Sequence, residues 1–127
     1  MRAGERMVAP EVSSQIQTAD QGILQGMPAS SGAYTGVARI IASERQFSRI
    51  QPGDVLVCPT TRSSWSTVFA TIGAVITDAG GALSHPAIIA REQRIPAVVA
   101  TGNATKIIRD GALVTADGAA GTITLNN

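Results

Sequence analysis

The chain has 127 residues, which suits a single domain, and its ten basic and nine acidic side chains leave a formal net charge of +1. Such a chain lacks the basic excess that phosphate-based binding of nucleic acids needs, and an aromatic content of 3% provides no platform for stacking bases. Hydrophobic residues make up 44% of the sequence, so one core of Ala, Val, Ile and Leu can form. We therefore expect an α/β domain that binds no nucleic acid.

Cysteine usage and hydropathy exclude further classes of protein. Cys58 is the only cysteine, which rules out an intrachain disulfide and a zinc cluster built on several cysteines. No apolar run approaches the roughly 18 residues of a membrane span, and the N-terminus lacks the apolar block of a secretory signal. We expect a cytoplasmic protein without membrane contact. A domain this small is expected to be one module of a multi-substrate reaction.

The first expected strands follow a polar leader. Residues 1–22 have no sustained apolar period and are expected to be a flexible leader or linker, and residues 23–127 are expected to form the domain. After the Ser30-Ser31-Gly32 turn, residues 34–41 alternate loosely and predict a half-buried strand. Later runs are apolar on both faces and predict strands covered on both sides: residues 55–58, 74–76, 97–99 and 112–114.

Three short helices are expected between and after these strands. Ser63 or Ser64 is predicted to cap the first, whose shared apolar face consists of Trp65, Val68, Phe69 and Ile72. The second is expected over residues 85–93, and Asn103 is predicted to cap the third. Asp117-Gly118 is a turn signal that precedes an expected edge strand over residues 121–125. The fold class predicted is therefore α/β, with a mixed sheet flanked by short helices.

One turn carries most of the chemical information. It follows an apolar strand, passes through Gly80 and Gly81, and enters a helix at His85, the only histidine of the chain. Adjacent glycines permit positive φ and let consecutive N–H groups converge on an anion. Pro86 suits the first helical turn, which puts His85 at or beside the N-cap, and the Ser84 hydroxyl is available to cap the helix or to bind a phosphate oxygen.

The position of His85 has two interpretations. The positive end of a helix dipole disfavours a charged imidazolium, and the free N–H groups there stabilise an attached phosphoryl group. A covalent phosphohistidine intermediate needs both effects. Against this, a single histidine near a glycine pair is more often a capping or packing residue. The residues alone leave both interpretations open.

A longer run favours the first interpretation. The residues Gly80-Gly81-Ala82-Leu83-Ser84-His85-Pro86-Ala87-Ile88-Ile89-Ala90-Arg91-Glu92, continued by Ile95-Pro96-Ala97-Val98-Val99, resemble the signature of the mobile phosphohistidine domain of phosphoenolpyruvate-utilising enzymes. That family includes phosphoenolpyruvate synthase, pyruvate phosphate dikinase and rifampicin phosphotransferase. The resemblance covers most of the chain, from Gly26 to Gly118, and leaves only residues 1–22 outside it.

The resemblance implies a phosphoryl-carrier function. It implies that His85 forms a tele-phosphohistidine, that Gly80, Gly81 and Ser84 surround the phosphate, and that the domain swivels between two partner sites. One partner is expected to be an ATP-grasp-type nucleotide-binding domain and the other a domain for phosphoenolpyruvate, pyruvate or another acceptor. ATP, phosphoenolpyruvate or pyruvate, and magnesium are expected on those partners, with no cofactor or metal bound by this domain. The isolated chain is not expected to complete a turnover.

Five further residues have individual expectations. Leu83 stands where phosphoenolpyruvate synthase and pyruvate phosphate dikinase carry a regulatory threonine, so that form of control is not implied here. Arg94 replaces a glycine that commonly ends the helix, so either the helix closes differently or Arg94 adopts a positive φ. Arg91 is expected to tie the helix to the sheet or to a domain interface, and Asp78 to form the turn. Cys58 is expected to be a buried structural thiol.

Two rival interpretations remain. One is a free-standing, non-catalytic copy that docks to a partner enzyme without carrying phosphate. The other is a purely structural swivelling domain, which predicts that His85 is buried away from solvent.

Overall fold

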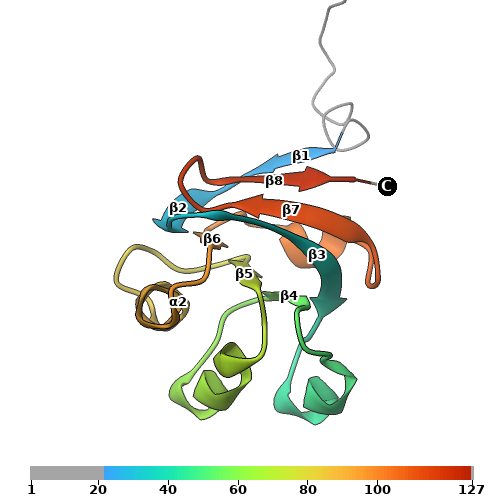
Figure 1. Cartoon of the computed structure of the whole chain (residues 1–127), viewed down its shortest axis with the longest axis vertical. Coiled ribbons are helices and arrows are strands. Elements are labelled where there is room, and N and C mark those ends of the chain that lie inside the picture. The colour runs from blue at the N-terminus through green and yellow to red at the C-terminus, as the bar shows by residue number, and fades with distance from the viewer. Residues whose placement is uncertain (1–21, 127) are drawn as a thin grey trace, which may run out of the picture.

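Eight strands form one mixed sheet in the computed structural model, which describes residues 22–126. The predicted leader therefore lies outside the described residues, except for Gly22. The strand order is β1-β8-β7-β3-β4-β5-β6-β2 (Figure 1). The strands are β1 (Ile23–Gln25), β2 (Met27–Ser30), β3 (Ala33–Ile40), β4 (Val55–Cys58), β5 (Ala74–Thr77), β6 (Ala97–Val99), β7 (Leu113–Asp117) and β8 (Thr122–Leu125). The predicted α/β fold class is confirmed.

The centre of the sheet is parallel and its flanks are antiparallel. Strands β3, β4, β5 and β6 run parallel to one another, whereas β1, β8 and β7 pair antiparallel on one side and β2 pairs antiparallel with β6 on the other. Three short helices cover one face of the parallel strands: η1 (Glu44–Arg49), η2 (Ser63–Ala70) and α2 (His85–Gln93). Helix α3 (Ala104–Ile107) packs on the other face (Figure 1).

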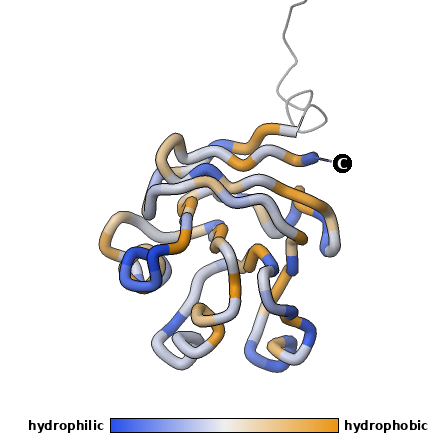
Figure 2. Tube along the Cα trace, viewed as in Figure 1, coloured by the Kyte–Doolittle hydropathy of each residue, from blue (hydrophilic) through white to orange (hydrophobic). Residues whose placement is uncertain are grey.

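Two apolar clusters explain why the central strands are hydrophobic on both faces. In β4, Val55 and Val57 point into the cluster shared with α3, β7 and β8. The alternate residues, Leu56 and Cys58, point into the cluster shared with η2 and α2. All four residues are fully buried, and the apolar central strands lie between more hydrophilic outer segments (Figure 2). The parallel sheet is thus sandwiched, as the sequence pattern predicts.

The C-terminal strand corrects one sequence-based expectation. The predicted edge strand is real, but β8 lies between β7 and β1, so β1 rather than β8 forms that edge of the sheet. The pairing of β1 with β8 aligns Leu24 with Ile123. Strand β1, strand β2 and helix η1 were not predicted, because each is short and none shows a clear period.

Helix η2 also differs from its prediction. It is a 3₁₀ helix that starts at Ser63, and its N-cap residue is Arg62 rather than Ser63 or Ser64, with no side-chain cap. Its apolar face is as expected, since Trp65 and Phe69 are buried. The Trp65 ring meets Phe47 of η1 edge to face, with ring centroids 5.0 Å apart. None of the helices within residues 22–126 is long and apolar enough to cross a membrane.

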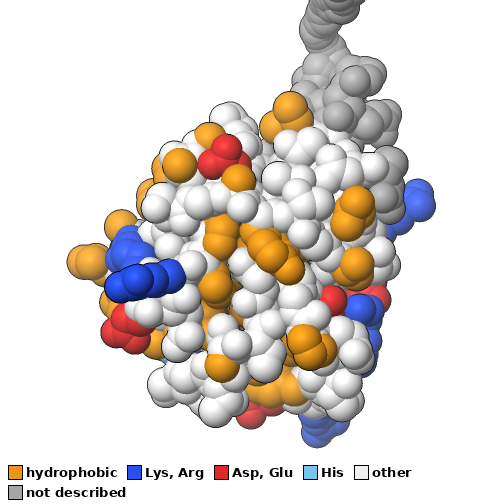
Figure 3. Space-filling view, viewed as in Figure 1, with side chains coloured by type: hydrophobic (Ala, Val, Ile, Leu, Met, Phe, Trp, Pro, Cys, Tyr) orange, Lys and Arg blue, Asp and Glu red, His pale blue; other side chains and the backbone are white. Residues whose placement is uncertain are grey.

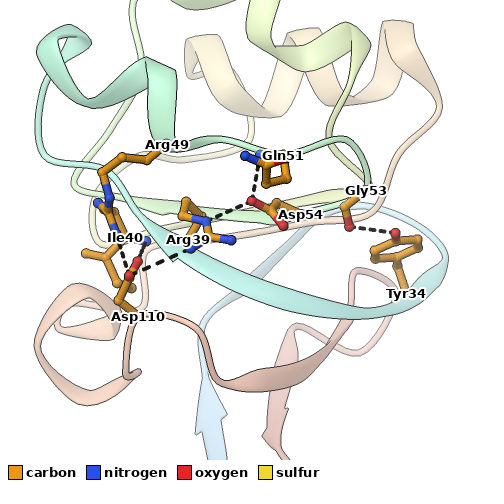
Figure 4. Close-up of polar contacts among 8 residues, drawn as sticks. All are labelled: Tyr34, Arg39, Ile40, Arg49, Gln51, Gly53, Asp54 and Asp110. Atoms are coloured by element: carbon orange, nitrogen blue, oxygen red, sulfur yellow. Dashed lines mark hydrogen bonds and ion pairs between the residues drawn. The ribbon is translucent and has the colours of Figure 1, made fainter.

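A polar network holds η1 and the segment before β7 against strand β3 (Figure 4). The Asp110 carboxylate accepts a hydrogen bond of 2.8 Å from the Ile40 N–H and forms an ion pair with Arg49. Arg39 lies between two carboxylates, 2.9 Å from Asp54 and 3.9 Å from Asp110. Asp54 is almost completely buried, so its pairing with Arg39 offsets the cost of removing a charge from water.

Candidate functional site

His85 lies at the start of helix α2, just after the turn that follows the parallel strand β5. Strand β5 ends at Thr77, and His85 is the first residue of α2, followed by Pro86 at the position where proline costs no hydrogen bond. The intervening turn needs its glycine, since Gly80 has φ of +119° and a Cβ there would lie 2.9 Å from the Ser84 Oγ. The predicted placement of His85 at the helix N-terminus is therefore correct.

Ser84 stabilises the turn rather than capping the helix. It is the N-cap residue of α2, but its hydroxyl makes no cap hydrogen bond and instead donates to the Gly81 carbonyl over 2.7 Å. The first N–H groups of α2 therefore do not have this hydroxyl as a partner. A Cβ built on Gly81 would meet nothing within 4 Å, so the outer side of the turn is open.

The imidazole of His85 is held from three sides. Its Nδ1 lies 2.7 Å from the Oγ1 of Thr61, which is only 4% exposed. Its Nε2 lies 3.4 Å from the Ser66 Oγ, at the outer limit for a hydrogen bond. The Phe69 ring stands edge to face with the imidazole at 88°, with centroids 6.1 Å apart. The ring is half-buried, and Nε2 is the nitrogen with the weaker partner.

The sequence analysis missed both hydroxyl residues that face His85. Thr61 precedes His85 by 24 residues and Ser66 by 19, and no local spacing links them. One signal was present: Thr61 follows β4, and β4 pairs in parallel with β5, which leads to His85. The carboxyl ends of neighbouring parallel strands meet at one edge of a sheet, where ligands commonly bind.

Two clefts open on the surface of the domain, one at each end of the parallel strands. The first, of about 450 Å³, lies beside η1 and the start of η2, and its walls include Arg45, Arg62 and Trp65. The second, of about 400 Å³, is lined by Ala29, Ser30, Ser31, Arg91 and Arg94. His85, which is half-buried, is not among the residues that line either of them.

Comparison with known families identifies the domain. The family model described as "PEP-utilising enzyme, mobile domain" matches residues 50–121, more than half of the chain, and the match contains the whole turn and helix around His85. The chain belongs to this family. The family resemblance seen in the sequence is confirmed, and with it the predicted function of a phosphohistidine-carrying swivelling domain of phosphotransferases.

Relatives of this mobile domain are much longer proteins. The uncharacterized phosphotransferase YvkC of Bacillus subtilis is 45% identical over 125 residues, which are 98% of this chain and 15% of YvkC. The phosphoenolpyruvate synthase of Aeropyrum pernix is 42% identical over 102 residues, 80% of this chain and 12% of that enzyme. The mobile domain thus spans less than one sixth of the length of these two relatives.

A solved structure agrees with the family assignment. The solution structure of an Enzyme I protein (nEIt) superimposes with a TM-score of 0.55 at 34% identity, over 63% of this chain and 33% of that one. At 34% identity the similarity extends beyond the fold, and it supports the same class of carrier domain.

Other residues of the mobile domain have structural roles. Arg91 ties α2 to the sheet as expected, with its Nε donating to the Ala29 carbonyl over 2.8 Å. Arg94 ends α2 in the left-handed region with φ of 60°, which confirms the second of the two alternatives for this position. Asp78 was expected to form the turn, but its carboxylate accepts the N–H and the hydroxyl of Thr105 and so caps α3. The predicted cap, Asn103, is the N-cap residue but makes no side-chain cap.

Cys58 is a buried thiol, as expected. It is fully buried at the end of β4 and has no disulfide partner. Burial, with a smaller contribution from the negative charge of Asp78, raises the pKa of the Cys58 thiol far above its usual value. The thiol stays protonated, so Cys58 is not a nucleophile. Among residues 22–126, no group of three or more His, Cys, Asp or Glu side chains is arranged to hold a metal ion.

Proposed function

We propose that His85 is the residue that carries the phosphoryl group, and that it does so on Nε2. The observation that supports this most directly is the asymmetry of the ring: Nδ1 is engaged by the buried Thr61 hydroxyl at 2.7 Å, whereas Nε2 has only Ser66 at 3.4 Å. In the tautomer with the proton on Nδ1, the Thr61 hydroxyl oxygen accepts a hydrogen bond from Nδ1–H, and Nε2 keeps its lone pair. This is the tautomer that a nucleophilic Nε2 requires.

Transfer of the phosphoryl group then proceeds in two steps. The Nε2 lone pair attacks the terminal phosphorus of the donor, the Nε2–P bond forms, and the P–O bond to the leaving nucleotide breaks with its electron pair on oxygen. The ring keeps its proton on Nδ1, where Thr61 accepts the hydrogen bond from the now cationic imidazole. In the second step the acceptor attacks the phosphorus, and the electron pair of the Nε2–P bond returns to Nε2.

The turn and helix provide the surroundings of the phosphoryl group in this proposal. Gly80 and Gly81 let the backbone come close to the phosphate, and the N-terminus of α2 stabilises its negative charge. Ser84 donates to Gly81 in the resting state, so it reaches the phosphate only if its hydroxyl rotates. In the resting state Ser84 therefore stabilises the conformation of the turn.

The donor and acceptor sites belong to partner domains in this proposal. We assign ATP to an ATP-grasp-type domain, phosphoenolpyruvate, pyruvate or another acceptor to a second domain, and magnesium to those sites. The partial exposure of His85 and the much greater length of the relatives support this division. The isolated chain then completes no turnover without its partners, and a cytoplasmic location belongs to the same proposal. The partly exposed ring favours a carrier over a purely structural module.

Phosphorylation of the isolated domain tests the site directly. Phosphoramidate, a small phosphoryl donor, is incubated with the chain, and acid-labile phosphate is located by mass spectrometry at alkaline pH. His85 is the only histidine, so every phosphohistidine in an untagged chain is on His85. ¹⁵N NMR of the ring then distinguishes Nε2 from Nδ1.

The proposal also requires that His85 be phosphorylated enzymatically. The cognate ATP-binding domain, either in the full-length enzyme that carries this chain or added in trans, is expected to phosphorylate wild type from ATP and to leave His85→Gln unlabelled. Equal labelling of His85→Gln and wild type would contradict the assignment of the residue. A phosphoryl group found on Nδ1 would contradict the assignment of the atom.

A further inference from the structure

The second cleft, between the end of β2 and the C-terminal end of α2, has a basic and hydroxyl-bearing lining. Its volume of about 400 Å³ lies within the roughly 300–1,000 Å³ of pockets that hold small ligands. Ala29, Ser30, Ser31, Arg91 and Arg94 line it, and none of them is acidic. This composition favours an anionic ligand over a cation or an apolar molecule.

Ser30 is a buried polar residue that faces this cleft. It is 9% exposed, and its hydroxyl has no hydrogen-bond partner among residues 22–126. Most buried polar side chains do have a partner, so a buried hydroxyl without one is a candidate ligand-binding group. The pairing of β2 with β6 shifts register between Pro28 and Ser30. Such a bulge changes the direction of a side chain, and bulges are common next to functional sites.

Arg91 is held in the cleft by carbonyl groups rather than by a carboxylate. Its Nε donates to the Ala29 carbonyl over 2.8 Å, and its Nη2 donates to the Ala82 carbonyl over 2.6 Å. These bonds use two of the five N–H groups of the guanidinium. No carboxylate within residues 22–126 forms an ion pair with Arg91. Its orientation is therefore fixed before a ligand arrives, which lowers the entropic cost of binding an anion.

Arg94 brings a second guanidinium to the cleft from an unfavourable backbone conformation. Its φ of 60° is in the left-handed region, which glycine adopts more easily than a residue with a Cβ. Strain of this kind is often found at functional sites. In the described part of the chain Arg94 forms no ion pair either. Figure 3 shows basic side chains, with an acidic one beside them, at the edge where Figure 1 places α2.

We propose that this cleft binds a phosphate dianion, either inorganic phosphate or the phosphate group of a small phosphomonoester. Two guanidinium groups that line one cleft repel each other, and a dianion between them removes that repulsion. Guanidinium N–H groups match phosphate oxygens in pairs, and the Ser30 and Ser31 hydroxyls can donate to the remaining oxygens. A carboxylate has one charge and two oxygens, so it matches this lining less well. The proposal does not depend on the function assigned to His85.

NMR titration of the ¹⁵N-labelled chain tests the site. Inorganic phosphate and glycerol phosphate are added separately, with sodium chloride used to keep the ionic strength constant. We expect saturable shifts of the Ser30 and Ser31 amide signals and of the Arg94 Nε–H signal. Tighter binding of glycerol phosphate would identify a phosphomonoester as the ligand class, and tighter binding of the free ion would identify inorganic phosphate.

Arg94→Gly separates a binding role from a structural one. Glycine suits the left-handed conformation, so the variant should have a higher midpoint of thermal unfolding. It should nevertheless bind phosphate about ten- to hundredfold more weakly, as expected for the loss of a charged hydrogen bond. Arg109→Gln is the matched control, because it removes the same charge from an exposed arginine that does not line the cleft. Its affinity for phosphate should equal that of wild type.

Three results would overturn the proposal. The first is wild-type affinity for phosphate in Arg94→Gly. The second is shifts that grow linearly with phosphate concentration and never saturate. The third is saturable shifts confined to residues 80–88, which would place the anion at the N-terminal end of α2 instead of in the cleft.

Discussion

At the scale of single residues, the proposed phosphohistidine site depends on which nitrogen of the His85 imidazole is engaged by a hydrogen bond. Thr61 is buried and lies within hydrogen-bond distance of Nδ1, and Phe69 restricts the plane of the ring. These two contacts fix the orientation of the imidazole, whose Nε2 faces the Ser66 hydroxyl at 3.4 Å. In the proposed reaction Thr61 is therefore a positioning residue, which acts through the tautomer and orientation of His85.

Replacing Thr61 by valine removes the hydroxyl and keeps the shape. We expect Thr61→Val to slow phosphorylation of His85 by about tenfold, the value of one hydrogen bond, and to shift the ¹⁵N signals of the ring toward a mixture of tautomers. Thr60→Val is the control, because the neighbouring Thr60 is exposed. An unchanged rate together with unchanged ¹⁵N signals would show that Thr61 has no such role.

At the scale of secondary-structure elements, Asp110 joins three segments of the chain. It contacts the end of β3 through the Ile40 N–H and η1 through Arg49, and it belongs to the segment that leads into β7. Partial burial raises the pKa of the Asp110 carboxyl, but the hydrogen bond from Ile40 and the charges of Arg49 and Arg39 outweigh it, so the net pKa is lowered. A lowered pKa in the folded state means that the ionised form stabilises the fold.

The sign of this linkage gives a pH-dependent prediction. The stabilisation is present above the ordinary carboxyl pKa of about 4 and is lost as the pH falls through the lowered value. Asp110→Asn should reduce the free energy of unfolding at pH 7 by about 1 kcal/mol or less, because the side chain is partly exposed and screened. The difference from wild type should shrink in urea unfolding below about pH 4.

Glu92→Gln provides the comparison for Asp110→Asn, since Glu92 is exposed on α2. It should leave the free energy of unfolding almost unchanged at both pH values. A difference between wild type and Asp110→Asn that persists unchanged at pH 3 would contradict the role of the ionised carboxylate.

Elements also show how far the sequence predicts the structure. The strand near residues 34–41, the two-faced central strands and α2 follow from apolar periodicity, turn residues and the proline at the helix start. Strand β1 and the true position of β8 do not, because a three-residue strand has too few residues for a period and its partner is about a hundred residues away. The position of His85 was predictable from its own turn. Its contacts with Thr61 and Ser66 depend on how β4 and β5 pair.

At the scale of the whole molecule, a glycine lets the two ends of the sheet meet. Gly118 lies in the turn between β7 and β8, and its N–H donates to the Gly32 carbonyl over 2.7 Å. A Cβ at Gly118 would lie 1.7 Å from the Ser30 carbonyl oxygen at the end of β2. The turn of one flank therefore packs directly against the backbone of the opposite flank.

Substituting this glycine should separate the two flanks. We expect Gly118→Ala to lower the free energy of unfolding by about 1–3 kcal/mol, because backbone must shift to accept the added carbon. Gly81→Ala is the matched control, since a Cβ there meets nothing within 4 Å. Urea unfolding followed by the fluorescence of Trp65, the only tryptophan, measures both variants. Equal stability of Gly118→Ala and wild type would show that the close approach is not needed.

The pairing of β1 with β8 also determines where the two ends of the described chain lie. The first and last described strands lie side by side at one edge of the sheet, while α2 and His85 lie over β5 and β6 toward the opposite edge (Figure 1). The two ends of the described chain therefore lie together, with the Leu125 N–H donating to the Gly22 carbonyl, whereas the helix that bears His85 packs on β2, β5 and β6. Rotation of the swivelling domain about that one place carries α2 with it and requires no change within the fold.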